Sequence, residues 1–365
     1  MPVTRKMTTK VSHISRFLNK WAPQSTKLDY DNVGLLVGNS GNNVTKILTC
    51  LDVTEEVVDE AIEKKCDLIV SHHPLIFRGL KRINDDSLQG AIIYKLIRNE
   101  IGVIAAHTNL DAAQGGVSFI LARILGLSNI HFLDDSYPLA LFLSVSIPVN
   151  VADFLKERLE NMGVEDIEIL DYSKHDGSQK SVKLEARIEA YQESEVRKLV
   201  EDNLPGNNRN YQIFKLANDS DKVGMGAIGE FQEPKDGDKF LNLVSDKLSV
   251  EAIRYSGFAQ NIKKVAVCGG AGVSLTSLAR SRGADAFVTA DVKYHDYFIE
   301  KGSFMLLDVG HYESEVPVVD VMKNELSQAF KDVDVISTKV RTSPMRVHIN
   351  EFQNKNNLEN QNDQV

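Results

Sequence analysis

The chain is poor in cysteine and has no apolar run of the roughly 20 residues needed to span a bilayer. Its three cysteines, Cys50, Cys66 and Cys268, stand singly inside apolar runs. Without paired spacing they indicate neither a zinc knuckle nor a disulfide framework. The segment Met1–Lys10 also lacks the apolar core and small-residue cleavage site of a secretory signal. We therefore expect a soluble cytoplasmic protein with buried thiols and no membrane contact.

Positive charge is also in short supply, with 42 Lys and Arg against 51 Asp and Glu and a net charge of −9. Non-specific nucleic-acid binding is mostly electrostatic, so this balance argues against a nucleic-acid partner. A hydrophobic fraction of 42% is ordinary for globular proteins. Because 365 residues exceed one usual hydrophobic core, we expect two domains or one domain with an insertion.

Both outer parts of the sequence alternate short apolar runs with amphipathic runs, which indicates an α/β fold. The predicted strands are 46–53, 68–70, 103–106, 264–268, 286–289 and 304–308. The predicted helices are 54–65, which Thr54 caps, 89–99, 115–125, 274–282 and 315–330. We assign the outer segments, 1–130 and 226–352, to a single α/β domain.

The middle segment, 131–225, has a different order of elements. Its pattern predicts strand, helix, strand, strand, helix and strand, which is the ferredoxin-like arrangement, inserted into the outer domain. A polar turn at 173–181 contains Asp176-Gly177 and would close its hairpin. The Asn- and Gln-rich tail, 353–365, has no apolar face and is predicted to be disordered.

Two adjacent histidines, His72 and His73, follow the buried run 68–70 and precede Pro74. Ligands of open α/β sheets bind at the carboxyl ends of strands, and the turn at Pro74 allows both rings to face one cleft. A pair of hydrogen-bonded core histidines is the alternative.

A second strand end, after 103–106, carries His107 and Asp111. A carboxylate at this place can bridge two cations. Alternatively, Asp111 caps a helix that begins near Gly115.

A third strand end leads to His311 and Glu315, four residues apart and therefore on one face if a helix starts there. Glu313 would then point elsewhere. Core packing does not predict His, Asp or Glu at three separate strand ends, so we interpret them as a metal site.

The types of ligand narrow the choice of metal. The imidazoles of His72, His73 and His311 and the carboxylates of Asp111 and Glu315, without cysteine, suit Zn²⁺, Fe²⁺ or Mn²⁺. Zinc comes foremost, and Cu(I) or an iron–sulfur cluster fits this set poorly. Five ligands exceed the needs of one tetrahedral zinc that also holds water, and they suit two divalent ions bridged by a carboxylate.

Further polar residues fall near the expected cleft. His107 and His295 are candidate catalytic groups for proton transfer, with second-shell or surface roles as the alternative. The Gly269–Gly272 turn lies where backbone amides can hold phosphate, although a tight turn explains it equally well. The loop Asp29–Gly34 is either an ordinary turn or a substrate contact.

Five separated segments occur in one order: Asp31–Leu35, Ser71–Pro74, His107–Asp111, Thr289–Asp291 with His295, and Gly310–His311 with Glu315. This combination resembles the GTP cyclohydrolase I type 2 family, whose eukaryotic members are named as interactors of a transcriptional coactivator. The resemblance implies two metals, with His72 and His73 each on one, Asp111 on one, His311 on the other and Glu315 bridging.

The insertion is similar to the PII- and CutA-like domain of the longer bacterial members. That resemblance implies a toroidal homohexamer whose metal sites face an internal cavity. Two functions stay open: a metal-dependent hydrolase of a nucleotide or related small molecule, including opening of the guanine ring of GTP, or a non-catalytic metal-handling or regulatory hexamer whose insertion binds a ligand or partner. A catalytic site must keep an open coordination position, whereas a storage site can be closed.

Overall fold

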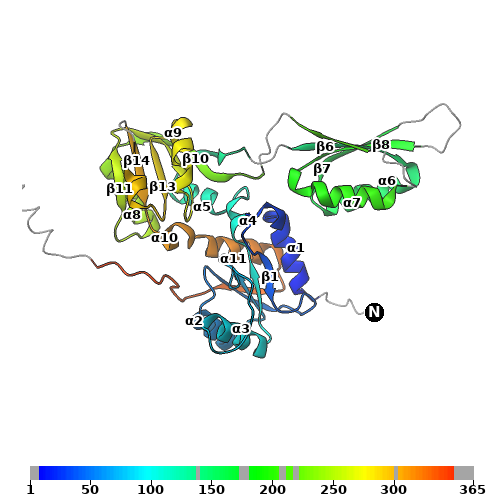
Figure 1. Cartoon of the computed structure of the whole chain (residues 1–365), viewed down its shortest axis with the longest axis horizontal. Helices are drawn as coiled ribbons and strands as arrows, with labels where there is room; N and C mark the ends of the chain where they lie inside the picture. The colour runs from blue at the N-terminus through cyan, green and yellow to red at the C-terminus, as the bar shows by residue number, and fades with distance from the viewer. Residues whose placement is uncertain are drawn as a thin grey trace, which may run out of the picture.

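The computed structural model describes residues 8–136, 140–171, 181–204, 211–216, 222–299 and 303–348. These residues form a mixed α/β fold with three sheets (Figure 1), which confirms the expected class. Apart from Ser181, the predicted turn at 173–181 lies outside the described residues, as does the predicted tail 353–365. No helix in the described part of the chain is long and apolar enough to cross a membrane.

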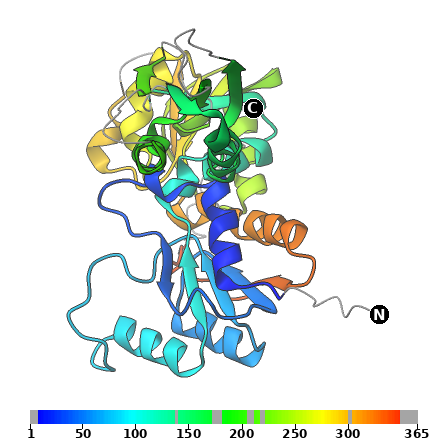
Figure 2. The same ribbon diagram turned by 90° about the vertical axis from the view of Figure 1, so that its right-hand side faces the viewer.

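The first sheet has five strands in the order β1-β4-β3-β2-β15. They are β1 (Gly34–Val37), β2 (Lys46–Cys50), β3 (Leu68–Ser71), β4 (Gly102–Ala105) and β15 (Asp334–Ser337). All are parallel except β1, and the parallel strands read as continuous apolar runs because both of their faces are buried. One face packs against α1 (Val11–Trp21) and α11 (Val318–Ala329), the other against α2 (Glu55–Glu63) and α3 (Leu88–Arg98). This layer forms the lower half of the view in Figure 2.

The second sheet has six strands in the order β11-β14-β13-β12-β10-β5. They are β5 (Ser128–Asp134), β10 (Met225–Lys235), β11 (Arg254–Phe258), β12 (Ile262–Val267), β13 (Ala286–Thr289) and β14 (Phe304–Asp308). The neighbouring pairs β12–β13 and β13–β14 are parallel, and the other neighbouring pairs are antiparallel. Helix α8 (Gly237–Leu248) covers one face and α9 (Thr276–Ser281) the other.

Helix α5 (Val117–Ile124) joins these two sheets. Val117 and Ile120 lie in the core of the five-stranded sheet, whereas Phe119 and Leu121 lie in the core of the six-stranded sheet. A helix that is apolar on nearly every side must be buried on every side. The burial of α5 therefore fixes how the two sheets sit against each other.

The third sheet is antiparallel, in the order β7-β8-β6-β9, and stands apart at one end of the molecule (Figure 1). Its elements follow the predicted chain order: β6 (Leu141–Pro148), α6 (Val149–Asn161), β7 (Glu165–Asp171), β8 (Ser181–Ile188), α7 (Glu193–Asn203) and β9 (Tyr211–Lys215). Leu143, Val145 and Ile147 alternate with more exposed residues and form a separate core with α6 and α7. The helices therefore cover one face of this sheet.

Two predicted helices have different bounds in the structure. The helix predicted at 315–330 corresponds to α11, whose N-cap residue is Pro317, and a separate short helix, α10 (His311–Glu315), precedes it. The predicted helix 274–282 opens as a 3₁₀ turn. Strand β5 spans residue 131 and pairs with β10 in the six-stranded sheet. Thr54 does cap α2, since its hydroxyl accepts from the amide of Val57.

We predict that deleting residues 136–221 and closing the gap with a short linker leaves a folded protein that still binds metal. This cut spares β5 and β10, and the removed segment carries its own core. Circular dichroism and elemental analysis would measure the result. An insoluble product with every linker length tried would contradict the prediction.

Candidate metal site

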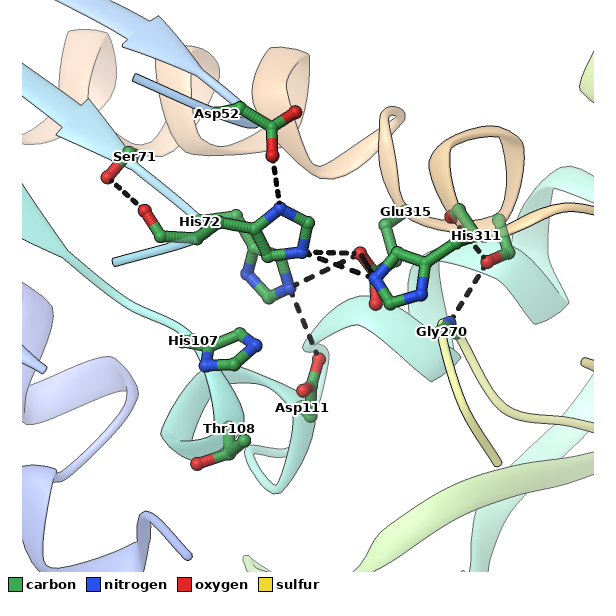
Figure 3. A network of polar contacts seen from close by, with 12 residues as sticks. Asp52, Ser71, His72, His107, Thr108, Asp111, Gly270, His311 and Glu315 are labelled. Atoms are coloured by element: carbon green, nitrogen blue, oxygen red, sulfur yellow. Dashed lines mark hydrogen bonds and ion pairs between the residues drawn. The ribbon is translucent and has the colours of Figure 1, made fainter. Parts of the chain in front are cut away.

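The carboxyl ends of parallel strands from both sheets converge on one site (Figure 3). Strand β3 leads into His72 and His73, β4 into His107, and β14 into His311. Parallel strands present their carboxyl ends at the same edge of a sheet, which explains why distant segments meet here. The short helices α4 (Thr108–Asp111) and α10 then add their side chains.

The His72 ring is fully buried at the centre of the site. Its Nδ1 donates to the carbonyl oxygen of Ala106 at 2.8 Å. Its Nε2 faces Asp111 Oδ1 at 3.6 Å and Glu315 Oε2 at 3.9 Å. Burial lowers the pKa of His72 to about 3, so the ring is neutral and its Nε2 lone pair points into the site.

His73 and His311 flank Glu315 from opposite sides. His73 bonds Asp52 through Nδ1 at 2.6 Å and Glu315 through Nε2 at 2.9 Å. His311 bonds Asp291 through Nδ1 at 2.8 Å and lies 3.1 Å from Glu315 through Nε2. Burial opposes protonation of His73, but its two carboxylate partners raise its pKa to about 10. The hydrogen bond to Glu315 raises the pKa of His311 to about 9.

The two inner carboxylates are shifted in opposite directions. Burial would raise the pKa of Glu315, yet the hydrogen bonds from His311 and His73 hold it below its usual range. Burial, followed by the charge of Glu315, raises the pKa of Asp111 well above its usual range. The two acids differ because Glu315 accepts hydrogen bonds from two imidazoles, whereas burial and the charge of Glu315 act on Asp111.

Two buried polar atoms at this centre have no hydrogen-bond partner among the described residues: His72 Nε2 and Asp111 Oδ1. Their separation of 3.6 Å is too long for a hydrogen bond. An unpaired buried polar group is costly, and a cation between these two atoms would satisfy both. The residues present therefore fit a metal ion.

The orientation of the rings also suits metal binding. Three groups have ligand atoms within 4.8 Å of one another: His72 with Asp111 and Glu315, His73 with His311 and Glu315, and His72 with His73 and His107. In the first two groups each imidazole is tied through Nδ1 to an oxygen and offers Nε2. Metal-ligating histidines are typically oriented by such outer hydrogen bonds.

The turn Gly269–Gly272 packs against Glu315. A Cβ on Gly270, whose φ is +61°, would lie 2.2 Å from Glu315 Oε1, so only glycine fits. The amide of Gly270 donates to Ser314 Oγ and the amide of Gly272 to Thr289 Oγ1, both at 3.0 Å. Because these amides are already engaged, the geometry supports the tight-turn interpretation over phosphate binding.

The loop Asp29–Gly34 holds His107 in place. His107 Nδ1 lies 2.9 Å from Asp31 Oδ1, and Asp31 also accepts from the amide and hydroxyl of Thr108. Burial would raise the pKa of Asp31, but the hydrogen bonds from His107 and Thr108 lower it well below its usual range. A charged Asp31 therefore fixes His107 through Nδ1, and its Nε2 has no hydrogen bond to any other described residue.

The other residues singled out in the sequence lie outside the centre of the site or have a different role there from the one considered. His295 lies on the exposed 3₁₀ turn η4 (Tyr294–Tyr297) and belongs to none of the three groups. Its ring meets that of Tyr294 edge-on and lies tilted near that of Phe298. Glu313 points away from the centre, as expected, and accepts from Arg341 at 3.2 Å. Gly116, not Asp111, is the N-cap residue of α5, so the capping alternative does not describe Asp111.

Sequence reasoning missed the outer carboxylate Asp52, which follows β2 and orients His73. Asp52 fell inside the predicted strand 46–53, whereas β2 ends at Cys50 and leaves this acid just after the strand, where the other candidates were found. Asp52 in turn accepts from the hydroxyl of Thr342. Thr342 lies in a stretch without secondary structure, and no sequence pattern could have assigned it to the site.

The geometry defines a mixed α/β protein with a His and carboxylate site at the junction of two sheets. A model of the family Duf34/NIF3 (NGG1p interacting factor 3) matches residues 9–344. The chain belongs to this family, which confirms the resemblance drawn from the sequence.

Individual proteins that resemble this chain in sequence or structure support the family assignment. A GTP cyclohydrolase 1 type 2 homolog of Staphylococcus epidermidis is 32% identical over 92% of this chain and 99% of its own length. A solved Staphylococcus aureus structure is 32% identical, with a TM-score of 0.74 over 93% of this chain and 99% of that one. A Bacillus cereus protein related to NIF3 is 30% identical, with a TM-score of 0.74 over 94% of this chain and 100% of that one.

We predict that His72→Ala and Glu315→Ala each remove most of the bound metal, because each variant deletes a donor atom from the centre of the site. Glu313→Ala is the matched control, since it removes a neighbouring carboxylate that points away. Elemental analysis with circular dichroism measures both metal and fold. Wild-type metal content in both ligand variants would refute the assignment.

We also predict that Asp52→Asn weakens metal binding by about 10- to 100-fold, because it removes the charge that orients His73. Asp320→Asn, whose carboxylate bonds Ser337 instead, serves as the control. Competition with a chromophoric chelator gives the dissociation constants. Equal affinity of the two variants would show that Asp52 does not act on the metal.

Proposed function

We propose that the protein is a dinuclear metal-dependent hydrolase of a nucleotide or related small molecule. The observation that carries this proposal is the convergence of three imidazole Nε2 atoms on Glu315, with the buried Nε2 of His72 left unpaired. Such a donor set at the meeting of strand ends is typical of hydrolytic metal centres.

The five residues that would hold the metals are His72, His73, Asp111, His311 and Glu315. Glu315 belongs to two of the close groups, which supports it as the bridging ligand. Zn²⁺ suits this donor set best, with Fe²⁺ or Mn²⁺ as alternatives. Divalent ions bound here would supply Lewis-acid activation of water and of an electrophilic substrate carbon.

His107 is the residue of this chain best placed to move a proton. Its ring lies 5.3 Å from that of His72 and 5.4 Å from that of His73, measured between centroids. Because Nδ1 donates to Asp31, Nε2 is the atom that accepts and returns the proton. We keep His295 as a weaker candidate for proton transfer, since its exposed position requires substrate to reach it.

The partial exposure of the site to solvent supports a catalytic role over a closed metal-storage role. His72 and Glu315 are almost fully buried, whereas 21% of the His73 side chain and 36% of the His311 side chain are exposed. One side of the site is therefore reachable from solvent, as a catalytic site requires. The name of the S. epidermidis relative, at 32% identity, supports a nucleotide as the substrate.

The third sheet supports a second candidate function. We propose that 131–225 is a ferredoxin-like, PII- or CutA-like domain inserted into a metal-binding domain formed by 1–130 and 226–352. Its sheet has helices on one face only, and the other face carries polar groups such as the ion pair of Lys183 and Glu185. Such a face suits a ligand, a partner or another copy, which favours a regulatory hexamer as the alternative.

Assembly and location belong to the same proposal. An inserted unit leaves open sheet edges, which other copies of the same chain commonly cover. Such copies usually assemble with closed point-group symmetry, which supports a homohexamer. Light scattering gives the stoichiometry. Three free, buried cysteines are consistent with a reducing cytoplasm.

We predict that the metal-free protein does not turn over any member of a nucleotide panel headed by GTP, and that added Zn²⁺, Fe²⁺ or Mn²⁺ restores turnover. His107→Ala should lower kcat by about 10²- to 10⁴-fold at unchanged metal content, because it removes the proton acceptor. Chromatographic assay of products measures the rates. Tight metal binding without turnover of any nucleotide would favour the regulatory alternative.

A further inference from the structure

One exposed stretch, residues 77–83, combines apolar and basic side chains. Phe77, Leu80 and Ile83 are exposed apolar residues. Arg78, Lys81 and Arg82 alternate with them and are exposed as well. In a chain whose net charge is −9, three cations within five residues form a local positive patch. We call residues 77–83 the cationic loop.

The cationic loop is anchored beside the candidate metal site. The side-chain amide of Asn32 donates to the carbonyl of Ile76 at 2.6 Å, and the side-chain amide of Gln89 donates to the carbonyl of Leu75. Asn32 follows Asp31, the residue that holds His107. One short segment, Asp31-Asn32, therefore fixes both the loop and the proposed proton acceptor.

An aromatic path leads from the site to the surface. The rings of His107 and Phe77 lie 6.4 Å apart, and those of Phe77 and Tyr30 lie 6.1 Å apart, in edge-on and tilted arrangements. Tyr30 is 66% exposed and Phe77 is 40% exposed. Large aromatic faces left in water beside a reactive site offer stacking surfaces for a planar ring.

The cations of the loop have no ion-pair partner among the residues that the structure describes. Arg78, Lys81 and Arg82 form no salt bridge with any carboxylate in the described parts of the chain, although Asp85 and Asp86 follow closely in sequence. Arg341 and Arg254, by contrast, are each paired with a carboxylate. Unpaired guanidinium and ammonium groups near a catalytic site favour phosphate oxygens.

We propose that the cationic loop together with Tyr30 is the recognition element for a substrate that joins a planar heteroaromatic ring to phosphate groups. The ring lies against Tyr30 and Phe77, and the phosphates bind Arg78, Lys81 and Arg82. The loop offers basic groups for phosphate, whereas the amides of Gly270 and Gly272 in the Gly269–Gly272 turn are already engaged. This inference rests on the proposed function for the reaction, whereas the binding itself can be measured separately.

Isothermal titration calorimetry of the metal-loaded full chain tests it with three probes: GTP, guanosine and inorganic triphosphate. The triple variant Arg78→Ala, Lys81→Ala, Arg82→Ala should bind GTP and triphosphate at least tenfold more weakly. The double variant Tyr30→Ala, Phe77→Ala should bind GTP and guanosine at least fivefold more weakly and triphosphate as the wild type does. These two patterns together separate ring recognition from phosphate recognition.

The matched control removes three exposed lysines elsewhere, Lys247, Lys263 and Lys331, each replaced by alanine, so that net charge changes equally. Metal content and circular dichroism must stay at wild-type values in all three variants. The loop is not the recognition element if GTP binds the charge variant and the control equally, or if wild-type protein does not bind GTP. Weakened binding without turnover in any variant would retain the loop and reject the hydrolase.

Discussion

The carboxylate of Glu315 is the interaction on which the site depends. It is buried, and it meets His73 from the five-stranded sheet and His311 from its own helix, α10. Gly270 must be glycine because this carboxylate occupies the space of its Cβ. A buried carboxylate is tolerated only where cations or donors surround it, so the neighbouring residues are constrained by its charge.

This constraint explains why the site lies between two sheets rather than at the edge of one. His72 and His73 come from one sheet and His311 from the other, and α5 packs into both cores. A shift of one sheet against the other would change the separation of 3.4 Å between the Nε2 atoms of His73 and His311. The apolar side chains of α5, which offer no metal-binding atom themselves, therefore set the geometry of the site.

The sequence predicted individual strands and helices better than it predicted how the strands pair in sheets. Buried parallel strands are continuous apolar runs, so 68–70 and 304–308 were recognisable, and polar residues directly after them marked the site. The element order of the insertion was also readable from its periodicity. Strands β5 and β10 were not anticipated, because an antiparallel pair that closes the sheet around an insertion depends on contacts between residues far apart in sequence.

Long-range hydrogen bonds explain the other omissions. Thr342 reaches Asp52 across 290 positions, and nothing local in the sequence marks either as partner of the other. Asp291 was visible as an acid after a strand, but its role in orienting His311 required the fold. Strand ends therefore reveal candidate ligands, whereas the residues that orient them are found only in three dimensions.

Charge is layered from the centre of the site outward. Glu315 and Asp111 lie inside, the imidazoles surround them, and Asp52, Asp291 and Asp31 hold three of those rings from behind. His73 and His311 thus each lie between the inner carboxylate of Glu315 and an outer carboxylate, which keeps Nδ1 outside and Nε2 inside. Added negative charge from a substrate would be repelled by this arrangement unless cations met it at the entrance. Metal ions at the centre and unpaired basic side chains on the cationic loop would compensate it from two sides, so a protein with a net charge of −9 can still favour an anionic ligand at one place.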